Sequence, residues 1–448
     1  MASTQLTRSI GSTGDRQKGT FSMWIKKSKT ATEQVFYSHY QDASNFLRAR
    51  FNDTDTINVN VKLSGTDYFA NTNAVFQDVG AFYHIVWAID TTQATAADRY
   101  KVYVNGTQQT MASSNYPSQN ENLIMNISGD TQAVGAMNSS TYFDGSMAHV
   151  HWTDGYAYDA STFGETDSTS GIWKPKTAPS VTYGTNGFFL KFENSGAMGT
   201  DSSGNTNTFT PAGTLTQNVD TPSNNFATFN PIYKAANQPT YTNGNLTATS
   251  SGSGYRISLS TLNNSTGKWY TEFKRAVGSS DEVFIGVSAE IDVNTSFNVN
   301  DRYMGETSKS IGISSGNGSS YIAGSATTYA ASYGTNDIIG IALDLTNKKL
   351  YASKNGAWSN GSGAWSSSTF DAAVGAIDIS SLIPSGELGY IGCSNTGTST
   401  LNANFGSGFF GTTAVASANA DANGHGAMEY PVPSGFYTLN TKNLKEFG

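Results

Sequence analysis

The chain has 448 residues, which is long enough for two or three domains with complete hydrophobic cores. Charged residues make up 13 % of it, below the roughly 25 % usual in soluble proteins, while aromatic residues make up 12 %, which excludes a disordered low-complexity chain. The formal net charge of −8 argues against a nucleic-acid-binding protein, because such proteins need a basic surface.

A single cysteine, Cys393, excludes an internal disulfide and a cysteine-based metal cluster. It stands in a strand-like run, where we expect a small buried hydrophobe. No apolar run approaches the roughly 18 residues of a membrane span. Residues 1–5 lack the basic and apolar parts of a secretory signal. We therefore expect no membrane insertion and a protein that is assembled in a cytoplasm.

Period-two alternation of apolar and polar residues dominates the first half of the chain. Residues 20–26 and 56–63 alternate in this way, and residues 83–90 read as a buried strand. An aromatic-rich alternating run then ends in Asn105-Gly106, the pair that best tolerates the positive φ angles of a type I′ turn. These signals predict antiparallel strands joined by tight hairpins. Helix signals are scarce, and residues 158–163 are the best candidate for a single turn.

The same strand-and-turn signal returns in the second half. Residues 337–344 read as a buried strand, and an alternating run ends in Asn355-Gly356. Prolines and turn residues at 218–231 interrupt the strand pattern between the halves. The fold class we predict is therefore all-β, with two tandem antiparallel β-sandwiches.

The composition also predicts the domain boundaries. We expect the first sandwich at residues 1–217, a linker at 218–234, the second sandwich at 235–410 and an extended C-terminal tail at 411–448. The tail begins with small polar residues and ends with prolines and aromatics. We expect it to pack onto a domain or onto a neighbouring subunit.

Both halves resemble known domain families. Residues 6–27 and 143–155 resemble the first strands and a late core strand of laminin G-like, concanavalin-type jelly rolls in virion proteins of tailed bacteriophages. Residues 267–273, 285–288 and 337–356 resemble the core strands of a SPRY domain, a β-sandwich used for protein recognition. The resemblance implies a concanavalin-like jelly roll followed by a SPRY-like sandwich.

Two further segments, residues 220–231 and 433–444, resemble parts of structural proteins of marine and cyanobacterial phages. Together the resemblances imply a non-enzymatic protein on the virion surface, as a capsid decoration or a tail or fibre component. Its expected partners are other virion proteins and further copies of itself. The alternative is a receptor-binding module that recognises a polysaccharide of the host cell surface. Both functions involve binding and not catalysis. The fold alone does not indicate either of them, so both expectations rest on the resemblance.

One loop offers oxygen atoms to a metal. Asp201, Asn205 and Asn207 could coordinate Ca²⁺, which prefers oxygen ligands. The alternative, which we favour, is an Asx-type turn in which the same oxygens accept hydrogen bonds from backbone N–H groups. We expect no other cofactor.

Five aromatic residues in glycine-rich loops of the second half are candidates for a ligand-binding surface, since aromatic rings suit both sugars and protein interfaces. They are Tyr321, Tyr329, Tyr333, Trp358 and Trp365. The alternative is that they pack in the interior or at an interface.

Other reactive groups give no catalytic arrangement. His149 and His151 could form a metal pair, but two exposed or locally bonded histidines are favoured. Asp53 and Asp55 fall in a hairpin turn, which we expect to be solvated and so unsuited to the paired carboxylates of a glycosidase. Glu272 has no visible partner, and we expect it on a wet face. We therefore predict that the protein is not an enzyme.

Overall fold

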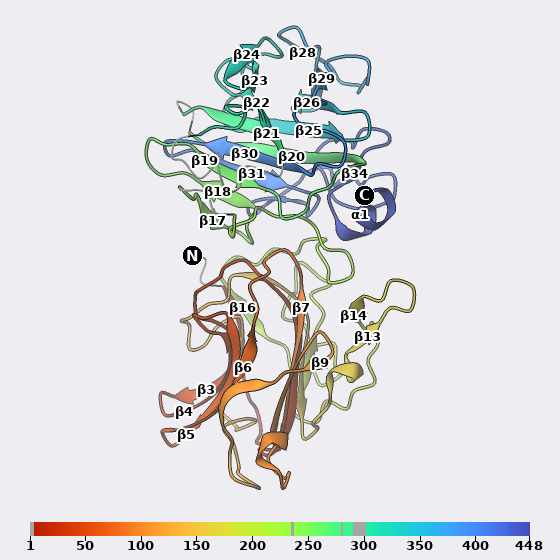
Figure 1. The fold of residues 1–448 in the computed structure, drawn as a ribbon. Helices are drawn as coiled ribbons and strands as arrows, with labels where there is room; N and C mark the ends of the chain where they lie inside the picture. Colours follow the sequence, from red (N-terminus) through yellow and green to blue (C-terminus); the bar gives the residue numbers. More distant parts are fainter. Residues whose placement is uncertain (1–3, 234–236, 279–280, 290–301) are drawn as a thin grey trace. The chain divides into compact units, whose positions relative to one another are not determined.

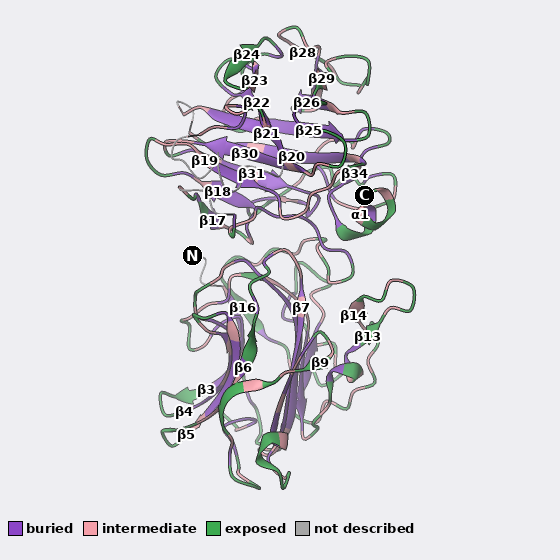
Figure 2. Ribbon diagram, in the orientation of Figure 1, coloured by how far each residue is buried: buried purple, intermediate pink, exposed green. Residues whose placement is uncertain are grey.

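A computed structural model describes residues 4–233, 237–278, 281–289 and 302–448, which fold into two compact units, 1–217 and 218–448. In each unit two large, mainly antiparallel sheets supply the core (Figure 1). The central strands are buried and the connecting loops are exposed (Figure 2). The predicted all-β fold class is confirmed. The expected border at 234/235 lies outside the described residues.

The first unit contains an eight-stranded and a six-stranded sheet. The eight-stranded sheet has the order β10 (Met111–Asn115), β6 (Thr66–Val75), β5 (Thr56–Leu63), β4 (Asn45–Phe51), β3 (Gln34–Asp42), β11 (Thr131–Val134), β1 (Gln5–Ser9) and β16 (Thr210–Ala212). The six-stranded sheet has the order β15 (Phe188–Leu190), β12 (Gly145–Asp154), β2 (Lys18–Lys27), β7 (Tyr83–Asp90), β8 (Tyr100–Val104) and β9 (Thr107–Gln108). The remaining elements are the pair β13 (Gly164–Thr166) and β14 (Trp173–Pro175) and two 3-10 turns, η1 (Ala96–Asp98) and η2 (Ala160–Thr162).

The six-stranded sheet of this unit is buried on both faces. One face supplies core residues such as Phe21 and Trp87. The other face is covered by the segment around η2 and β14, where Phe163 packs against Val86. Asp159 accepts a hydrogen bond from the Ser161 N–H and so caps η2, which lies where the sequence predicts a single helical turn.

The second unit contains a ten-stranded and a six-stranded sheet. The larger has the order β17 (Thr240–Thr242), β18 (Thr247–Thr249), β31 (Thr400–Asn404), β20 (Lys268–Val277), β25 (Ile338–Asp344), β26 (Lys349–Lys354), β27 (Ala357–Ser359) and β28 (Trp365–Ser367), with β29 (Ile377–Asp378) beside β26 and β34 (Tyr437–Thr438) beside β20. The smaller has the order β19 (Arg256–Leu259), β30 (Gly389–Asn395), β21 (Val283–Ala289), β22 (Ser310–Ser314), β23 (Ser320–Ile322) and β24 (Ser325–Thr327). The remaining elements are β32 (Phe409–Phe410), β33 (Thr413–Ala414) and the helix α1 (Thr441–Phe447).

Both Asn-Gly hairpins form as predicted. Asn105 and Gly106 have φ angles of 48° and 83°, and they connect β8 to β9. Asn355 and Gly356, with φ angles of 49° and 80°, connect β26 to β27. In both cases the positive angles are those of the type I′ turn.

The segments expected as a linker and an extended tail are folded parts of the second unit. The backbone N–H of Ala227 donates to Leu439, and that of Thr441 donates to Asn225, so the two ends of the unit lie side by side. Strand β34 pairs with β20 in parallel. The chain then forms α1, whose N-terminus is capped by Asn440. Residues 218–233 are thus part of the second unit and not a linker. The C-terminal segment packs onto this unit, as expected of the tail, but it ends in a helix and is not extended throughout.

Candidate binding site

A groove of about 370 Å³ opens on the second unit. Its walls come from the hairpin β23–β24, from the chain just after β24 and from β29. Hydroxyl side chains and apolar surfaces alternate along it: Ser320, Ile322, Ser325, Thr327, Tyr329 and Ile377. The hairpin owes its shape to the turn at Ala323 and Gly324, with φ angles of 51° and 73°. Such a mixture can hold a ligand by hydrogen bonds and apolar contact.

One carboxylate, that of Asp378, lines the groove. It accepts a hydrogen bond from Lys349 at 2.7 Å and another from the Ser380 hydroxyl at 2.6 Å. The Lys349 ammonium and the Ser380 hydrogen bonds hold the pKa of Asp378 well below its ordinary value. Asp378 therefore stays ionised at neutral pH and cannot donate a proton there.

Three of the five predicted aromatic residues are buried, as the alternative of interior packing predicts. The Tyr329 hydroxyl donates to the Gly375 carbonyl at 3.0 Å and accepts from the Ala352 N–H at 2.9 Å. The Tyr333 hydroxyl donates to the Ile313 carbonyl at 2.9 Å. These two side chains have only 3 % of their surface exposed.

Trp358 is the third buried aromatic residue. Its ring lies 4.9 Å from that of Phe370 and 6.2 Å from that of Tyr270. The loop that follows it is rich in glycine, but the outer face of the sheet carries enough apolar surface to bury the indole. Trp358 is therefore a packing residue.

Tyr321 and Trp365 are only half-buried. The Tyr321 hydroxyl accepts a hydrogen bond from Asn317 at 3.1 Å, and its ring packs edge-on against Phe284. The Trp365 indole donates to the Ala331 carbonyl at 2.8 Å. A ligand can reach only these two of the predicted aromatics over a substantial surface. Of the predicted residues, Tyr329 lines the groove. The serine and threonine hydroxyls of the groove were not singled out from the sequence, and the turn-forming Ala323-Gly324 pair is the sequence signal that could have indicated their hairpin.

The Asp201 loop is an Asx-type turn. One carboxylate oxygen of Asp201 accepts from the N–H groups of Phe189 and Ser203, and the other accepts from the N–H of Asn207 at 2.8 Å. The amide groups of Asn205 and Asn207 both donate to the Gly187 carbonyl. Backbone N–H groups thus occupy both carboxylate oxygens of Asp201, as the alternative interpretation of this loop predicts.

The paired histidines of β12 are held by aromatic neighbours. His151 stacks on Phe189 with ring centroids 3.9 Å apart, and one ring nitrogen lies 2.9 Å from the Tyr183 hydroxyl. Burial lowers the pKa of His151 well below its ordinary value. His149 adopts a φ of 47° at a bulge in the strand, and it is half-buried.

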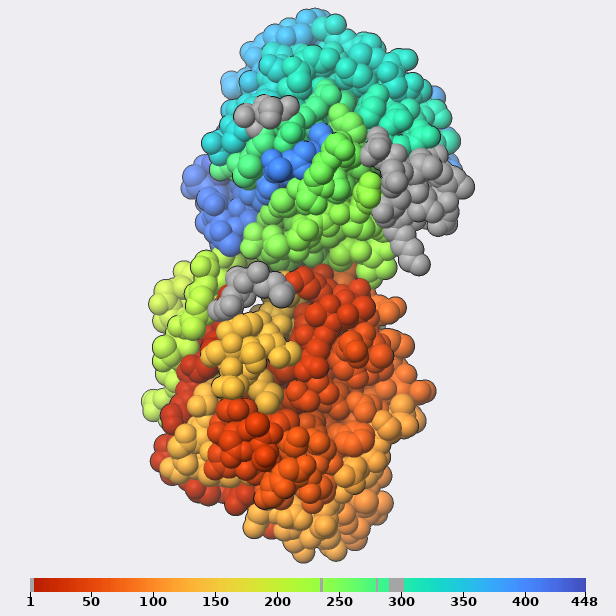
Figure 3. Space-filling model, turned by 90° about the vertical axis from the view of Figure 1, so that its left-hand side faces the viewer, coloured from red at the N-terminus to blue at the C-terminus, as the bar shows by residue number. Residues whose placement is uncertain are grey.

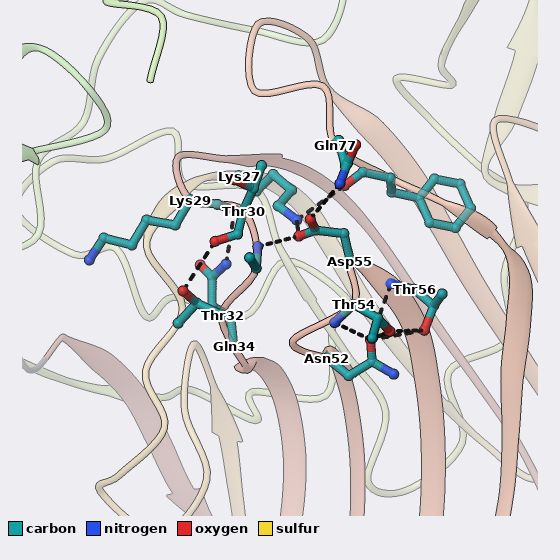
Figure 4. A network of polar contacts seen from close by, with 12 residues as sticks. Lys27, Lys29, Thr30, Thr32, Gln34, Asn52, Thr54, Asp55, Thr56 and Gln77 are labelled. Atoms are coloured by element: carbon teal, nitrogen blue, oxygen red, sulfur yellow. Dashed lines mark hydrogen bonds and ion pairs between the residues drawn. The ribbon is translucent and has the colours of Figure 1, made fainter. Parts of the chain in front are cut away.

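Asp55 is buried rather than solvated. Its carboxylate lies 2.6 Å from the Lys27 ammonium, with side-chain exposures of 1 % and 0 % (Figure 4). It also accepts from the Ala31 N–H and from the Gln77 amide. Burial lowers the pKa of Lys27, and the hydrogen bond to Asp55 opposes that shift. The pair ties three loops of the first unit together and carries no sign of an acid–base site.

Glu272 is likewise buried, which corrects the expectation of a wet face. One of its carboxylate oxygens accepts from the Tyr430 N–H and the other from the Glu429 N–H, both at 2.8 Å. The Tyr270 hydroxyl donates to it at 3.1 Å. Burial raises the pKa of Glu272 to about 7. Its role is to hold the C-terminal segment against β20.

Among residues 4–233, 237–278, 281–289 and 302–448, no cluster of three or more histidine, cysteine, aspartate or glutamate side chains could hold a metal ion. In the same part of the chain, no helix is long and apolar enough to cross a membrane.

Comparisons with solved structures give only distant likenesses. The SPRY domain of human HERC1 has 17 % identity and a TM-score of 0.29, covering 39 % of this chain and 96 % of that one. A heptameric SAP-like pentraxin from Limulus polyphemus has 14 % identity and a TM-score of 0.29, covering 42 % and 88 %. Domain 4 of the arabinanase AbnA from Geobacillus stearothermophilus, solved with arabinotriose, has 17 % identity and a TM-score of 0.26, covering 32 % and 64 %.

Comparison with families is more informative. No curated protein matches the chain. Residues 3–160 match the Laminin_G_3 family, described as the concanavalin A-like lectin/glucanases superfamily, and residues 268–376 match the SPRY domain. Domains of these two kinds suggest binding to proteins or to carbohydrates. The chain thus carries a concanavalin A-like domain of the laminin G type followed by a SPRY domain.

Proposed function

We propose that the protein is a non-enzymatic structural protein on the exterior of a tailed-phage virion, and that it binds its partners through the groove of the second unit. The observation that supports a binding function is the groove in the second unit. It offers hydroxyl groups and apolar surface, and its one carboxylate is held ionised by Lys349. Hydrolysis of a glycoside needs two carboxyl groups, one of them able to donate a proton. The groove is thus suited to binding rather than to catalysis.

The virion role rests on the sequence resemblance. The two segments that resemble phage structural proteins, 220–231 and 433–444, contact each other at the ends of the second unit. Both segments are therefore folded parts of the second unit and not separate linkers. The partners we propose are neighbouring virion proteins and further copies of this chain, with assembly in the cytoplasm of the host bacterium.

The second candidate function is recognition of a host surface polysaccharide. The hydroxyl groups of the groove and the half-buried Tyr321 and Trp365 favour it, because sugars need both hydrogen-bonding groups and aromatic surfaces.

Immunogold electron microscopy of intact particles, with an antibody against residues 218–448, tests the location. Label over the capsid is the result expected of a decoration protein. Label confined to the tail tip or fibres would make polysaccharide recognition the primary function. Absence of label from particles would contradict the virion proposal.

A variant pair tests the groove itself. Ser325→Trp fills the groove, whereas Ala326→Trp places the same side chain on the same strand but outside the groove lining. We expect S325W to reduce attachment of the purified protein to depleted particles at least tenfold, and A326W to leave it within twofold. Equal attachment of both variants would exclude the groove as the contact surface.

A further inference from the structure

A flap of residues 155–184 covers the outer face of the six-stranded sheet in the first unit. It carries η2, β13 and β14, and its residues Phe163 and Trp173 cluster with Val86 of the sheet. In Figure 1 the flap lies on the side of this sheet that faces away from the eight-stranded sheet. Figure 3 views the opposite side of the unit, where residues 34–63 contribute to the red-orange surface. Movement of the flap would uncover the outer face of the six-stranded sheet.

The two ends of the flap meet at one point. The backbone N–H of Asp154 donates to the Tyr183 carbonyl at 2.8 Å. Gly155 and Gly184 have φ angles of 89° and 66°, and a Cβ at position 184 would lie 2.0 Å from the Asp154 carbonyl oxygen. The Asp154 carboxylate is fixed in turn by the backbone N–H and the side-chain amide of Asn186, both at 3.0 Å. The flap thus joins a fixed base through a glycine at each end, an arrangement that suits a hinge.

The flap is anchored to the sheet by the indole of Trp173. Its Nε1–H donates to Nδ1 of His84 at 3.0 Å. Glycines make room for the ring, because a Cβ at Gly106 would lie 3.0 Å from the indole and one at Gly164 would lie 2.5 Å from it. The His84 ring stacks on Trp173 and on Trp24, with centroids 6.0 and 4.7 Å apart. The position of the flap therefore depends on the state of His84.

The hydrogen bonds of His84 fix its protonation state. An indole nitrogen can only donate, so Nδ1 of His84 accepts and carries no proton. The other ring nitrogen, Nε2, lies 2.9 Å from the Ser22 hydroxyl. A proton on Nδ1 would set two donors against each other and leave the Trp173 N–H without its acceptor. The closed flap is therefore compatible only with a neutral imidazole at position 84.

The surroundings of His84 also disfavour a positive charge. The charged and titratable side chains of the elements packed around it are His149 and His151 of β12, Lys26 of β2, Tyr103 and Lys101 of β8, Lys191 and Glu193 after β15, and Tyr158, Asp159, Glu165, Asp167, Lys174, Lys176 and Tyr183 of the flap. The acidic groups Glu165 and Asp167 are paired with Lys174. Burial, together with the neighbouring His149, lowers the pKa of His84 to about 3.

We propose that the flap is opened by acid: it is closed at neutral pH and is released when His84 takes up a proton. In the open form the imidazole meets water and regains its ordinary pKa of 6.5, so the open form binds the proton more tightly. The closed form is therefore fully favoured above pH 6.5 and becomes less favoured as the pH falls towards 3. The equilibrium constant for opening rises about tenfold for each pH unit in this range. This device lies in the first unit, does not involve the groove and goes beyond the proposed function.

Thiol accessibility in the full-length protein tests the proposal, with dithiodipyridine as the reagent. Val86→Cys places a thiol beneath the flap, Val59→Cys places one in the core between the sheets, and Val75→Cys places one at an exposed position. The natural Cys393 is fully buried in the second unit. Relative to V75C, we expect the reaction rate of V86C to rise at least tenfold from pH 7.5 to pH 5.0, while that of V59C changes less than twofold.

Two results would overturn the proposal at this stage. A parallel rise for V86C and V59C would show that acid unfolds the whole first unit. A V86C rate that does not respond to pH would show that the flap stays closed.

Variants in the V86C background assign the response to His84. His84→Asn can still accept the indole hydrogen bond but takes up no proton, so we expect its pH response to fall below threefold. His425→Asn, in the second unit, should retain the response of at least tenfold. Trp173→Phe keeps His84 and removes the opposing donor, so we expect faster reaction at pH 7.5 and a weaker pH response. A full pH response in H84N, or a W173F variant that behaves as the V86C parent does, would overturn the proposal.

Discussion

Single side chains close the loops of both units. Asn105 and Asn355 each supply a turn residue, and their side chains also accept a backbone hydrogen bond at the start of β7 and β25, from His84 and Ile338, both at 2.8 Å. Lys27 and Asp55 hold three loops of the first unit together. They do so through an ion pair that is inaccessible to water. Such a pair is stable only while both charges are present.

Removing one partner of that pair should be strongly destabilising. Lys27→Met leaves the Asp55 carboxylate buried without a counter-charge, and we expect a loss of about 3–5 kcal/mol in the free energy of unfolding of the first unit. In Lys27→Met/Asp55→Asn the buried charge is gone, and asparagine tolerates the φ of 59° at this position. Urea denaturation should show that the double variant recovers most of the loss. A double variant as unstable as K27M would contradict this account.

At the level of elements, the C-terminal segment acts as a cover for one face of the ten-stranded sheet. Met428 and Phe436 pack against Tyr270, Tyr351 and Trp358, which would otherwise be exposed. Glu272 holds the same segment through two backbone N–H groups. Because these amides arrive from residues far along the chain, nothing near Glu272 in the sequence indicates that it is buried.

The attachment of this cover should depend on pH. Because the pKa of Glu272 is about 7 in the folded protein and ordinarily 4.5, the folded state retains a proton that the unfolded chain releases. The contribution of the protonated Glu272 to the free energy of unfolding is therefore fully present below pH 4.5. It decreases by at most about 3 kcal/mol as the pH rises to about 7. The difference in unfolding free energy between the wild type and Glu272→Gln should change by this amount between pH 4.5 and 8. A difference that stays constant over this pH range would contradict the assignment.

Local signals predicted the elements that depend on neighbouring residues. The Asn-Gly hairpins formed as expected, since the turn conformation is set by two adjacent residues. The burial of Glu272 and Asp55 could not be predicted, because the residues that cover them are distant in the sequence. The helix α1 was missed for a related reason. It has seven residues, and tertiary contacts with the segment at 224–227 support it more than helix propensity does.

At the scale of the whole molecule, the two units have separate cores. Among the described residues, the core of the first unit is formed by residues between Leu6 and Leu215, and that of the second by residues between Ala227 and Phe447. These two cores share no residue. The candidate groove belongs to the second unit, so substitutions in its lining leave the core of the first unit unchanged.

Truncation should reveal this independence. We expect residues 1–217 and residues 218–448 to fold when expressed alone, each with a cooperative thermal transition followed by circular dichroism. Residues 218–408 lack the cover on β20 and expose Tyr270, Tyr351 and Trp358, so we expect aggregation or the loss of a cooperative transition. A truncated unit that melts at the same temperature as 218–448 would show that the cover is dispensable.

The contact between the first and last segments of the second unit has an evolutionary consequence. Because residues 224–227 lie against residues 439–442, the chain enters and leaves this unit at neighbouring points. A recombination event with crossovers before Asn218 and after Phe447 transfers the complete unit with both of its ends already joined. Such a unit can be exchanged between genes as a whole domain. Another domain can be fused to it without changes to its core residues.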